Sequence, residues 1–247
     1  MERSTYTVTH HGLLIGLYGK TLEEHLGEYG LDIFANAIMR YAHERGQRMR
    51  KRAVRDGRRL DHETFLSYGE LQIPSSPEDY SIGSESPVYT LCCHRCMWQE
   101  SWARYGLERY GALYCRYVDL HLIQGFHPDL AMITRSALGL GDSCCTFSYV
   151  GYCQTPKSRQ RIAAVKKELA GQYTKDFLYH CGHLVNSFHT CISDILGEET
   201  ASLITRRTAC DFDTYTKDGY SKDILAEAQQ DFFRNISLEV LHFAVLY

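Results

Sequence analysis

Residues 114–147 read YCRYVDLHLIQGFHPDLAMITRSALGLGDSCCTF, and this stretch decides the fold that we expect. Its first part favours a helix that ends at the Gly-Phe-His-Pro sequence of residues 125–128, because proline cannot continue a helix. Residues 130–138 and 144–152 then flank Gly-Leu-Gly-Asp, which is typical of a β-hairpin. With a further strand expected at residues 88–93, the sequence predicts an α+β fold with a small antiparallel sheet.

Helices are expected on both sides of this centre. Residues 10–56 form an N-terminal helical arm with a broad apolar stripe. Residues 155–247 form a C-terminal arm that begins at Thr155-Pro156, a helix N-cap followed by proline at the first helical position. We therefore expect a single domain over residues 1–247, with residues 61–152 as central sheet and helix. The small sheet is flanked by helices contributed from both ends of the chain, and the two arms suggest a homodimer.

The remaining elements are less regular. Residues 98–124 read as one long helix, or as two joined near Gly111. A short strand is expected around residues 68–73. Residues 74–87 (PSSPEDYSIGSESP) are rich in turn formers, so we interpret them as a mobile loop or lid.

A weak internal repeat relates the two arms. Shifting the chain by 170 positions aligns identical residues: His10 with His180, Gly12 with Gly182, and Leu26-Gly27-Glu28 with Leu196-Gly197-Glu198. Both copies read as a helix, a Gly-Glu break and a second helix. We therefore predict that residues 10–40 and 180–210 form equivalent helical hairpins beside the sheet.

Composition limits the classes of partner. The chain has 247 residues, is 44% hydrophobic and 23% charged, and carries a net charge of −3, so no overall field favours nucleic acid or an anionic membrane. No apolar run approaches the ~20 residues of a membrane span. Residues 1–20 do not resemble a signal peptide. We expect a cytoplasmic protein whose ten cysteines are reduced.

One segment is strongly basic. Residues 45–59 hold eight cations (Arg45, Arg48, Arg50, Lys51, Arg52, Arg55, Arg58 and Arg59) against the single acid Asp56. A nucleic-acid or phosphate patch is one interpretation. We favour a solvated helix end, because no aromatic residues interleave with the cations. A third interpretation is that one or two arginines turn inward and hold a substrate carboxylate.

Cys115 and Asp119 are the first candidate functional residues. They lie four positions apart, which places them on one helix face. The carboxylate could accept the proton of the thiol or orient a water molecule beside it. The alternative is a buried cysteine beside an exposed aspartate. In the hairpin, Asp142 is also an ordinary choice for an Asx turn.

Metal binding is a separate alternative. Cys93 and Cys96 form a CxxC pair around His94, but no second CxxC pair follows at a zinc-binding distance. Cys144, Cys145 and the sequence His180-Cys181-Gly182-His183 would have to supply further ligands. We expect no cofactor, with zinc as the minor alternative.

A family resemblance adds to this reading. Tyr114-Cys115, Asp119, Gly125-Phe126-x-Pro128 and Gly141-Asp142-x-x-Cys145-x-Phe147 resemble the L-2-amino-thiazoline-4-carboxylic acid hydrolase family. Gly27-Glu28-x-Gly30 and Arg45-Gly46 fit the same pattern. The hairpin is also similar to small-molecule-binding domains related to 4-vinyl reductases. The first resemblance implies a hydrolase of non-peptide C–N bonds that opens a cyclic amidine to an N-carbamoyl amino acid.

The resemblance also implies roles. Cys115 would attack as a thiolate, or Asp119 would activate water. Cys145 and Asp142 would complete the catalytic pocket. The residues expected to contact the small-molecule substrate are Tyr114, Phe126, His127 and His94, the two histidines as proton donors. The alternatives are a non-catalytic small-molecule sensor and a Cys/His metal-binding protein.

Overall fold

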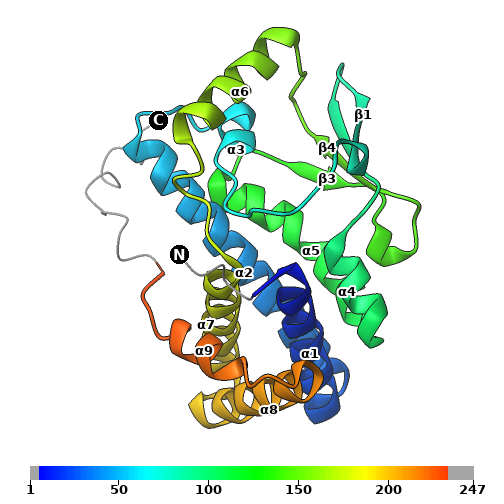
Figure 1. Ribbon diagram of the computed structural model, residues 1–247, viewed down its shortest axis with the longest axis vertical. Coiled ribbons are helices and arrows are strands. Elements are labelled where there is room, and N and C mark those ends of the chain that lie inside the picture. The colour runs from blue at the N-terminus through cyan, green and yellow to red at the C-terminus, as the bar shows by residue number, and fades with distance from the viewer. Residues whose placement is uncertain (1–5, 233–247) are drawn as a thin grey trace.

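The computed structural model describes residues 6–232 and has the expected α+β architecture. The helices are α1 (Val8–Leu26), α2 (Glu28–Arg55), α3 (His62–Ser67), α4 (Met97–Tyr105), α5 (Glu108–Phe126), α6 (Pro156–Leu169), α7 (Phe177–Leu196), α8 (Glu198–Thr216) and α9 (Ser221–Glu227). The strands are β1 (Tyr80–Ser84), β2 (Tyr89–Cys93), β3 (Met132–Thr134) and β4 (Cys145–Tyr149). They form an antiparallel sheet in the order β1-β2-β4-β3. Figure 1 shows this sheet at one end of the molecule and α1, α7, α8 and α9 at the other, with α2 and α5 between them.

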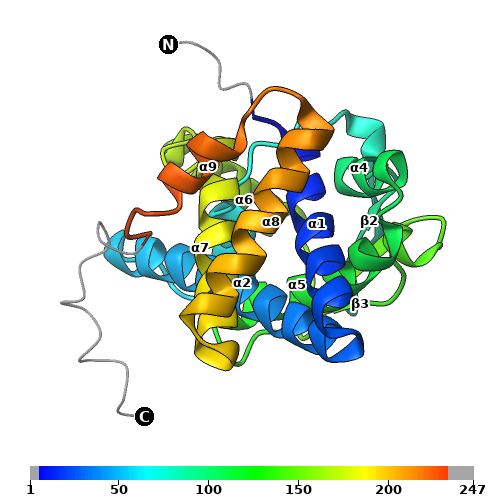
Figure 2. The ribbon, with the colours of Figure 1, turned by 90° about the horizontal axis from the view of Figure 1, so that it is seen from below.

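The two helix pairs related by the repeat have matching boundaries. Helix α1 ends at Leu26 and α7 ends at Leu196, each followed by a glycine with positive φ (63° at Gly27, 87° at Gly197) and then by a helix that begins with glutamate. Positive φ strains other residues, which explains a glycine at both breaks. The pairs pack together, as Figure 2 shows for α1, α7 and α8.

Helices α2 and α5 cross with their backbones in contact. A Cβ on Gly46 would lie 2.1 Å from the carbonyl oxygen of Leu122, and a Cβ on Gly125 would lie 2.2 Å from that of His43. Only glycine allows so close an approach. The crossing brings Arg45 of α2 against α5, the helix that carries the candidate site.

The sheet corrects several sequence expectations. The strand expected at residues 130–138 shortens to β3, because a 3-10 turn at Leu138–Leu140 follows it. The strand expected at residues 144–152 shortens to β4, whereas β2 nearly matches residues 88–93. Residues 74–87, expected as a mobile loop, contain β1. This strand pairs with β2 at the sheet edge, and its polar, exposed residues disguised it in the sequence.

Two further predictions, one of a strand and one of a helix break, were wrong in detail. The strand expected around residues 68–73 is absent: α3 precedes this segment, and only Leu71 makes an isolated bridge, to Lys175. The break in residues 98–124 falls at Gly106, not at Gly111. Gly111 instead packs against the ring of Trp102. Among the described residues, no helix is both long and apolar enough to span a membrane.

Candidate active site

The helix face that carries Cys115 and Asp119 meets the β3–β4 hairpin. The Thr134 hydroxyl of β3 donates a hydrogen bond to Oδ2 of Asp119 over 3.2 Å. Cys115 packs against a small buried cluster that contains Cys93, Ala137 and Cys145. The structure therefore brings Asp119 to the hairpin and Cys115 to Cys145, a contact that the family resemblance implied and that spacing alone did not.

Four thiols surround this face, and all of them favour the protonated form. Cys93 and Cys145 lie directly opposite each other on β2 and β4. Burial raises the pKa of Cys145 to about 12. Burial also raises the pKa values of Cys93, Cys96 and Cys115, and the negative charge of Asp119 raises all three further. A raised pKa leaves little thiolate at neutral pH, so these thiols are poor nucleophiles.

The pKa of Asp119 is raised as well, but in a carboxylate this rise gives a stronger base. Burial raises its pKa to about 6, although the Thr134 hydrogen bond and the charge of Arg45 act against this rise. The carboxylate is therefore ionised at neutral pH and is more basic than an ordinary aspartate. Asp119 and Cys115 are both half-buried, so neither is sealed from water. A carboxylate of this kind is suited to act as a general base.

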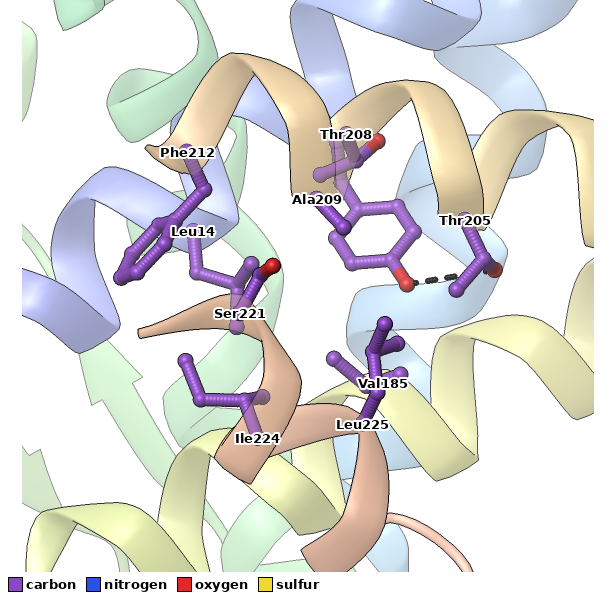
Figure 3. Close-up of a pocket in the computed structure, with 10 residues that line it drawn as sticks. Leu14, Val185, Thr205, Thr208, Ala209, Phe212, Ser221, Ile224 and Leu225 are labelled. Atoms are coloured by element: carbon purple, nitrogen blue, oxygen red, sulfur yellow. Dashed lines mark hydrogen bonds between the residues drawn. The ribbon is translucent and has the colours of Figure 1, made fainter. Parts of the chain in front are cut away.

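A cavity of about 30 Å³ lies next to this cluster. It is bordered by the thiols of Cys93 and Cys96, by residues 73–75 and 79–80, and by Arg95, Met97 and Trp98. This volume holds about two water molecules. Asp119 and Cys115 do not border the cavity, but Cys93 belongs both to its lining and to the cluster that Cys115 packs against. A smaller cavity of about 10 Å³ lies between α1, α7, α8 and α9, where Tyr18 donates to Thr205 and the lining is mostly apolar (Figure 3).

Two other expected site residues lie beside this cluster. Tyr114 is buried and packs edge-on against Trp102 with the ring centroids 5.8 Å apart. Asp142 is exposed and accepts a hydrogen bond from the backbone N–H of Ala137, five residues upstream, so its side chain closes the hairpin loop and does not form an Asx turn. Phe126 is fully buried in the core against Phe65.

Neither of the two expected proton donors has a contact with Asp119. His94 is exposed and hydrogen-bonds through Nε2 to the Ser81 hydroxyl. His127 accepts a hydrogen bond at Nδ1 from the backbone N–H of Asp129 and shapes the chain after α5. Both histidines have local structural partners instead.

The metal-binding alternative requires several ligands close together. Within residues 6–232, no three or more histidine, cysteine or acidic side chains are arranged to hold a metal ion. The Cys93 thiol donates to the carbonyl oxygen of Arg95, and His94 is engaged by Ser81.

A second buried cluster was missed in the sequence, and it centres on Glu70. Arg48 binds both oxygens of Glu70, with Nε and NH2 each at 3.0 Å, and Arg52 donates from NH1 to Oε1 over 2.7 Å. Burial alone would raise the pKa of Glu70, but these two arginines and Arg45 lower it far below its usual value. The expectation of a solvated helix end was therefore wrong for Arg45, Arg48 and Arg52.

The three arginines turn inward because they continue the apolar face of α2. The buried residues Phe34, Ile38, Tyr41, Arg45, Arg48 and Arg52 recur at alternating spacings of four and three positions. That spacing is the signature of one helix face, and it was visible in the sequence. The interpretation in which one or two arginines turn inward understated their number.

A chain of hydrogen bonds links the cavity to this region. Trp98, which borders the cavity, donates from Nε1 to Nδ1 of His11 over 2.9 Å. The other ring nitrogen of His11 therefore carries the proton and donates it to the Tyr41 hydroxyl, also over 2.9 Å. Arg45 in turn lies over the ring of Tyr41, with Cζ 5.6 Å from the ring centroid.

This arrangement is that of an α+β protein with a half-buried carboxylate and several thiols gathered where one helix face meets the sheet. Comparison with known families agrees: residues 6–149, more than half of the chain, match the L-2-amino-thiazoline-4-carboxylic acid hydrolase family, and the chain belongs to that family. The matched part includes Arg45, Glu70, Cys115, Asp119 and Cys145. The family name describes hydrolysis of a small cyclic amidine. No curated protein and no solved structure matches the chain.

Proposed function

We propose that the protein is a hydrolase that opens a thiazoline-type cyclic amidine, with Asp119 as the general base. The observation that supports this most is the half-buried Asp119 carboxylate, whose pKa is raised to about 6, on the helix face whose neighbour Cys93 borders a cavity that can hold water. A base with this pKa is ionised at neutral pH and still accepts a proton readily.

Water is a better candidate nucleophile than Cys115. Direct attack by Cys115 needs a thiolate, and a thiolate needs a nearby cation or hydrogen-bond donors. Cys115 has the contrary surroundings, because burial and the charge of Asp119 raise its pKa. Of the two routes open from the sequence, the one through Asp119 and water is therefore favoured.

The reaction balances with Asp119 moving two protons. In the first step Asp119 takes a proton from water and passes it to the ring nitrogen, as the water oxygen bonds to the amidine carbon. In the second step Asp119 takes the remaining hydroxyl proton and passes it to the ring sulfur, as the C–S bond breaks. The product is an N-carbamoyl amino acid with a free thiol. Since both nitrogens stay on the carbonyl carbon, the bond that we propose to break is C–S and not C–N.

The thiols of Cys115 and Cys145 would serve as neutral neighbours of the reacting ring. A neutral thiol adds no charge that competes with the amidine for Asp119. It is also a weak hydrogen-bond donor. We propose that the thiols shape the site around the ring and that neither forms a covalent intermediate.

Intact-protein mass spectrometry tests the choice of nucleophile. Wild-type protein and Cys115→Ser would be mixed with 2-amino-thiazoline-4-carboxylate, quenched at early times and weighed, while product is followed separately. We expect product from both proteins and no mass adduct on either. An adduct on the wild type that is absent from Cys115→Ser, together with loss of turnover in that variant, would exclude the water route. Cys210→Ser, which removes an exposed thiol, is the control.

A panel of cyclic amidines separates the enzyme from a sensor. Thermal-shift binding and product formation would be measured for thiazoline, oxazoline and imidazoline analogues. Product from at least one compound supports the hydrolase. Binding without turnover across the whole panel would favour a non-catalytic small-molecule-binding protein.

A further inference from the structure

Arg45 is buried yet makes no hydrogen bond with the residues that the structure describes. The residue is 5% exposed, and its Nε is buried without a partner within residues 6–232. Its nearest ionic neighbour is Oε2 of Glu70, 3.7 Å from Nε, which is beyond a good hydrogen bond. A guanidinium group carries five N–H donors. Of the Arg45 nitrogens, Nε is both buried and without a partner, which is costly unless a further acceptor is bound.

The neighbouring arginines differ from Arg45 in this respect. Arg48 and Arg52 bind Glu70 directly, and both oxygens of that carboxylate are already engaged. Glu44, a second carboxylate near the cluster, pairs with Arg40 and His183, and Arg40 also binds Asp194. Among the three arginines that face Glu70, Arg45 is the one without a hydrogen bond to it.

Arg45 also faces the acid and thiol site. The glycine crossing of α2 and α5 places Arg45 against α5. Its charge acts on Tyr114 and on Asp119, so the guanidinium lies near both side chains. A second buried atom nearby lacks a partner: Nε2 of His180 bonds the carbonyl oxygen of Glu70, and Nδ1 has no donor. Nε of Arg45 and Nδ1 of His180 are therefore both able to bind a further polar group.

We infer that Arg45 is the receptor for a carboxylate of the substrate, so the site is specific for amidines that carry an acid group. This inference rests on the proposed function, because it assigns the anionic end of the molecule whose ring Asp119 would hydrolyse. The guanidinium fork suits a carboxylate, which it can bind through two parallel hydrogen bonds. Glu70, which Arg48 holds through both oxygens, is the ionic neighbour that keeps Arg45 in place.

The test compares paired ligands that differ only at the acid group. S-Methyl-N-carbamoyl-cysteine and its carboxamide would be titrated into wild type, Arg45→Met and Arg45→Lys by calorimetry, which requires no turnover. Wild type should bind the acid roughly 30-fold or more tightly than the amide, the size expected for losing one buried charged hydrogen-bond partner. In Arg45→Met this preference should disappear. In Arg45→Lys it should shrink without vanishing.

Arg52→Met is the matched control, because Arg52 is equally buried but already bound to Glu70. It should lower the melting temperature and keep the preference for the acid. An unchanged preference in folded Arg45→Met or Arg45→Lys would overturn the inference and leave Arg45 with a structural role only. If no cyclic amidine is turned over but the preference depends on Arg45, the proposed reaction fails and the carboxylate receptor stands.

Discussion

Asp119 and Glu70 are both carboxylates held inside the protein, and their environments push their pKa values in opposite directions. Asp119 has a single hydrogen bond, from Thr134, and no ion pair with Arg45, so burial dominates and raises its pKa to about 6. Glu70 is saturated by Arg48 and Arg52, and the cations outweigh burial. Burial alone therefore does not identify a catalytic carboxylate. The number of cations bonded to the carboxylate distinguishes a candidate general base, such as Asp119, from a structural ion-pair partner, such as Glu70.

The largest expected effect is on activity, when the Asp119 carboxylate is replaced by its amide. Asp119→Asn keeps the shape of the side chain but removes the base, so kcat/KM for the thiazoline should fall by about 10²–10⁴-fold. The folded state should not weaken, because a poorly solvated charge is lost. The measurement is steady-state turnover together with a thermal melt. Asp142→Asn, at the exposed hairpin turn, should keep at least half of the activity. Equal losses in both variants would remove Asp119 from its proposed role.

Glu70→Gln should have its main effect on stability. It leaves three buried arginines without their shared anion, and breaking a buried ion pair from one side costs about 3–5 kcal/mol. Urea unfolding at pH 7 measures this loss in the free energy of unfolding. Glu100→Gln, which breaks the exposed pair with Arg95, should leave the midpoint unchanged. If Glu70→Gln leaves the free energy of unfolding unchanged, the buried arginines do not depend on that carboxylate.

The two carboxylates should also give opposite dependences of stability on pH. The folded pKa of Asp119 lies above its unfolded value of about 3.9, so the folded state holds a proton that the unfolded state has lost between pH 4 and 6. Its contribution to stability therefore decreases as pH rises through this window. The pKa of Glu70 is lowered, so its contribution is present above about pH 4.3 and is lost only in stronger acid.

Urea midpoints measured from pH 3 to 7 check this difference. Relative to wild type, Asp119→Asn should gain stability as pH rises from 4 to 6, because the unfavourable charge is absent. Glu70→Gln should fall further behind wild type as pH rises from 3 to 5, because the Glu70 carboxyl of the unfolded chain loses its proton there, whereas that of folded wild type is already ionised. Parallel curves for the two variants would contradict the contrast between the sites.

The sequence predicted the Asp119 region better than the Glu70 region, and the reason is the range of the contacts. Cys115 and Asp119 share a helix turn, and Gly-Leu-Gly-Asp marks the hairpin, so local spacing was enough to place them near each other. Glu70 lies in a segment without regular structure, and its partners are 18 to 25 positions away on α2. A run of cations on a helix resembles a solvated helix end. The inward-facing cations can be recognised only by checking which of them continue the three- and four-residue spacing of the preceding apolar residues.

Residue type misled the expectations where a local partner already existed. His94 and His127 were expected as proton donors and Asp142 as part of the catalytic pocket, but Ser81 and backbone N–H groups engage them. Phe126 was expected to contact substrate and instead fills the core. Such partners depend on backbone geometry that a single sequence does not reveal.

The smallest effect that we predict links the two regions through Arg45. Its positive charge lowers the pKa of Asp119, yet no ion pair joins the two side chains, so the effect should be below about one pH unit. The pH profile of kcat/KM for wild type should fall below a midpoint near 6, because the free base must be ionised. Arg45→Lys, which keeps the charge, should preserve this midpoint, whereas Arg45→Met should raise it. A substrate without a carboxylate is the right probe, since its binding does not use Arg45. An unchanged midpoint in Arg45→Met would show that the charge of Arg45 does not reach Asp119, and the two carboxylates would then be independent of each other.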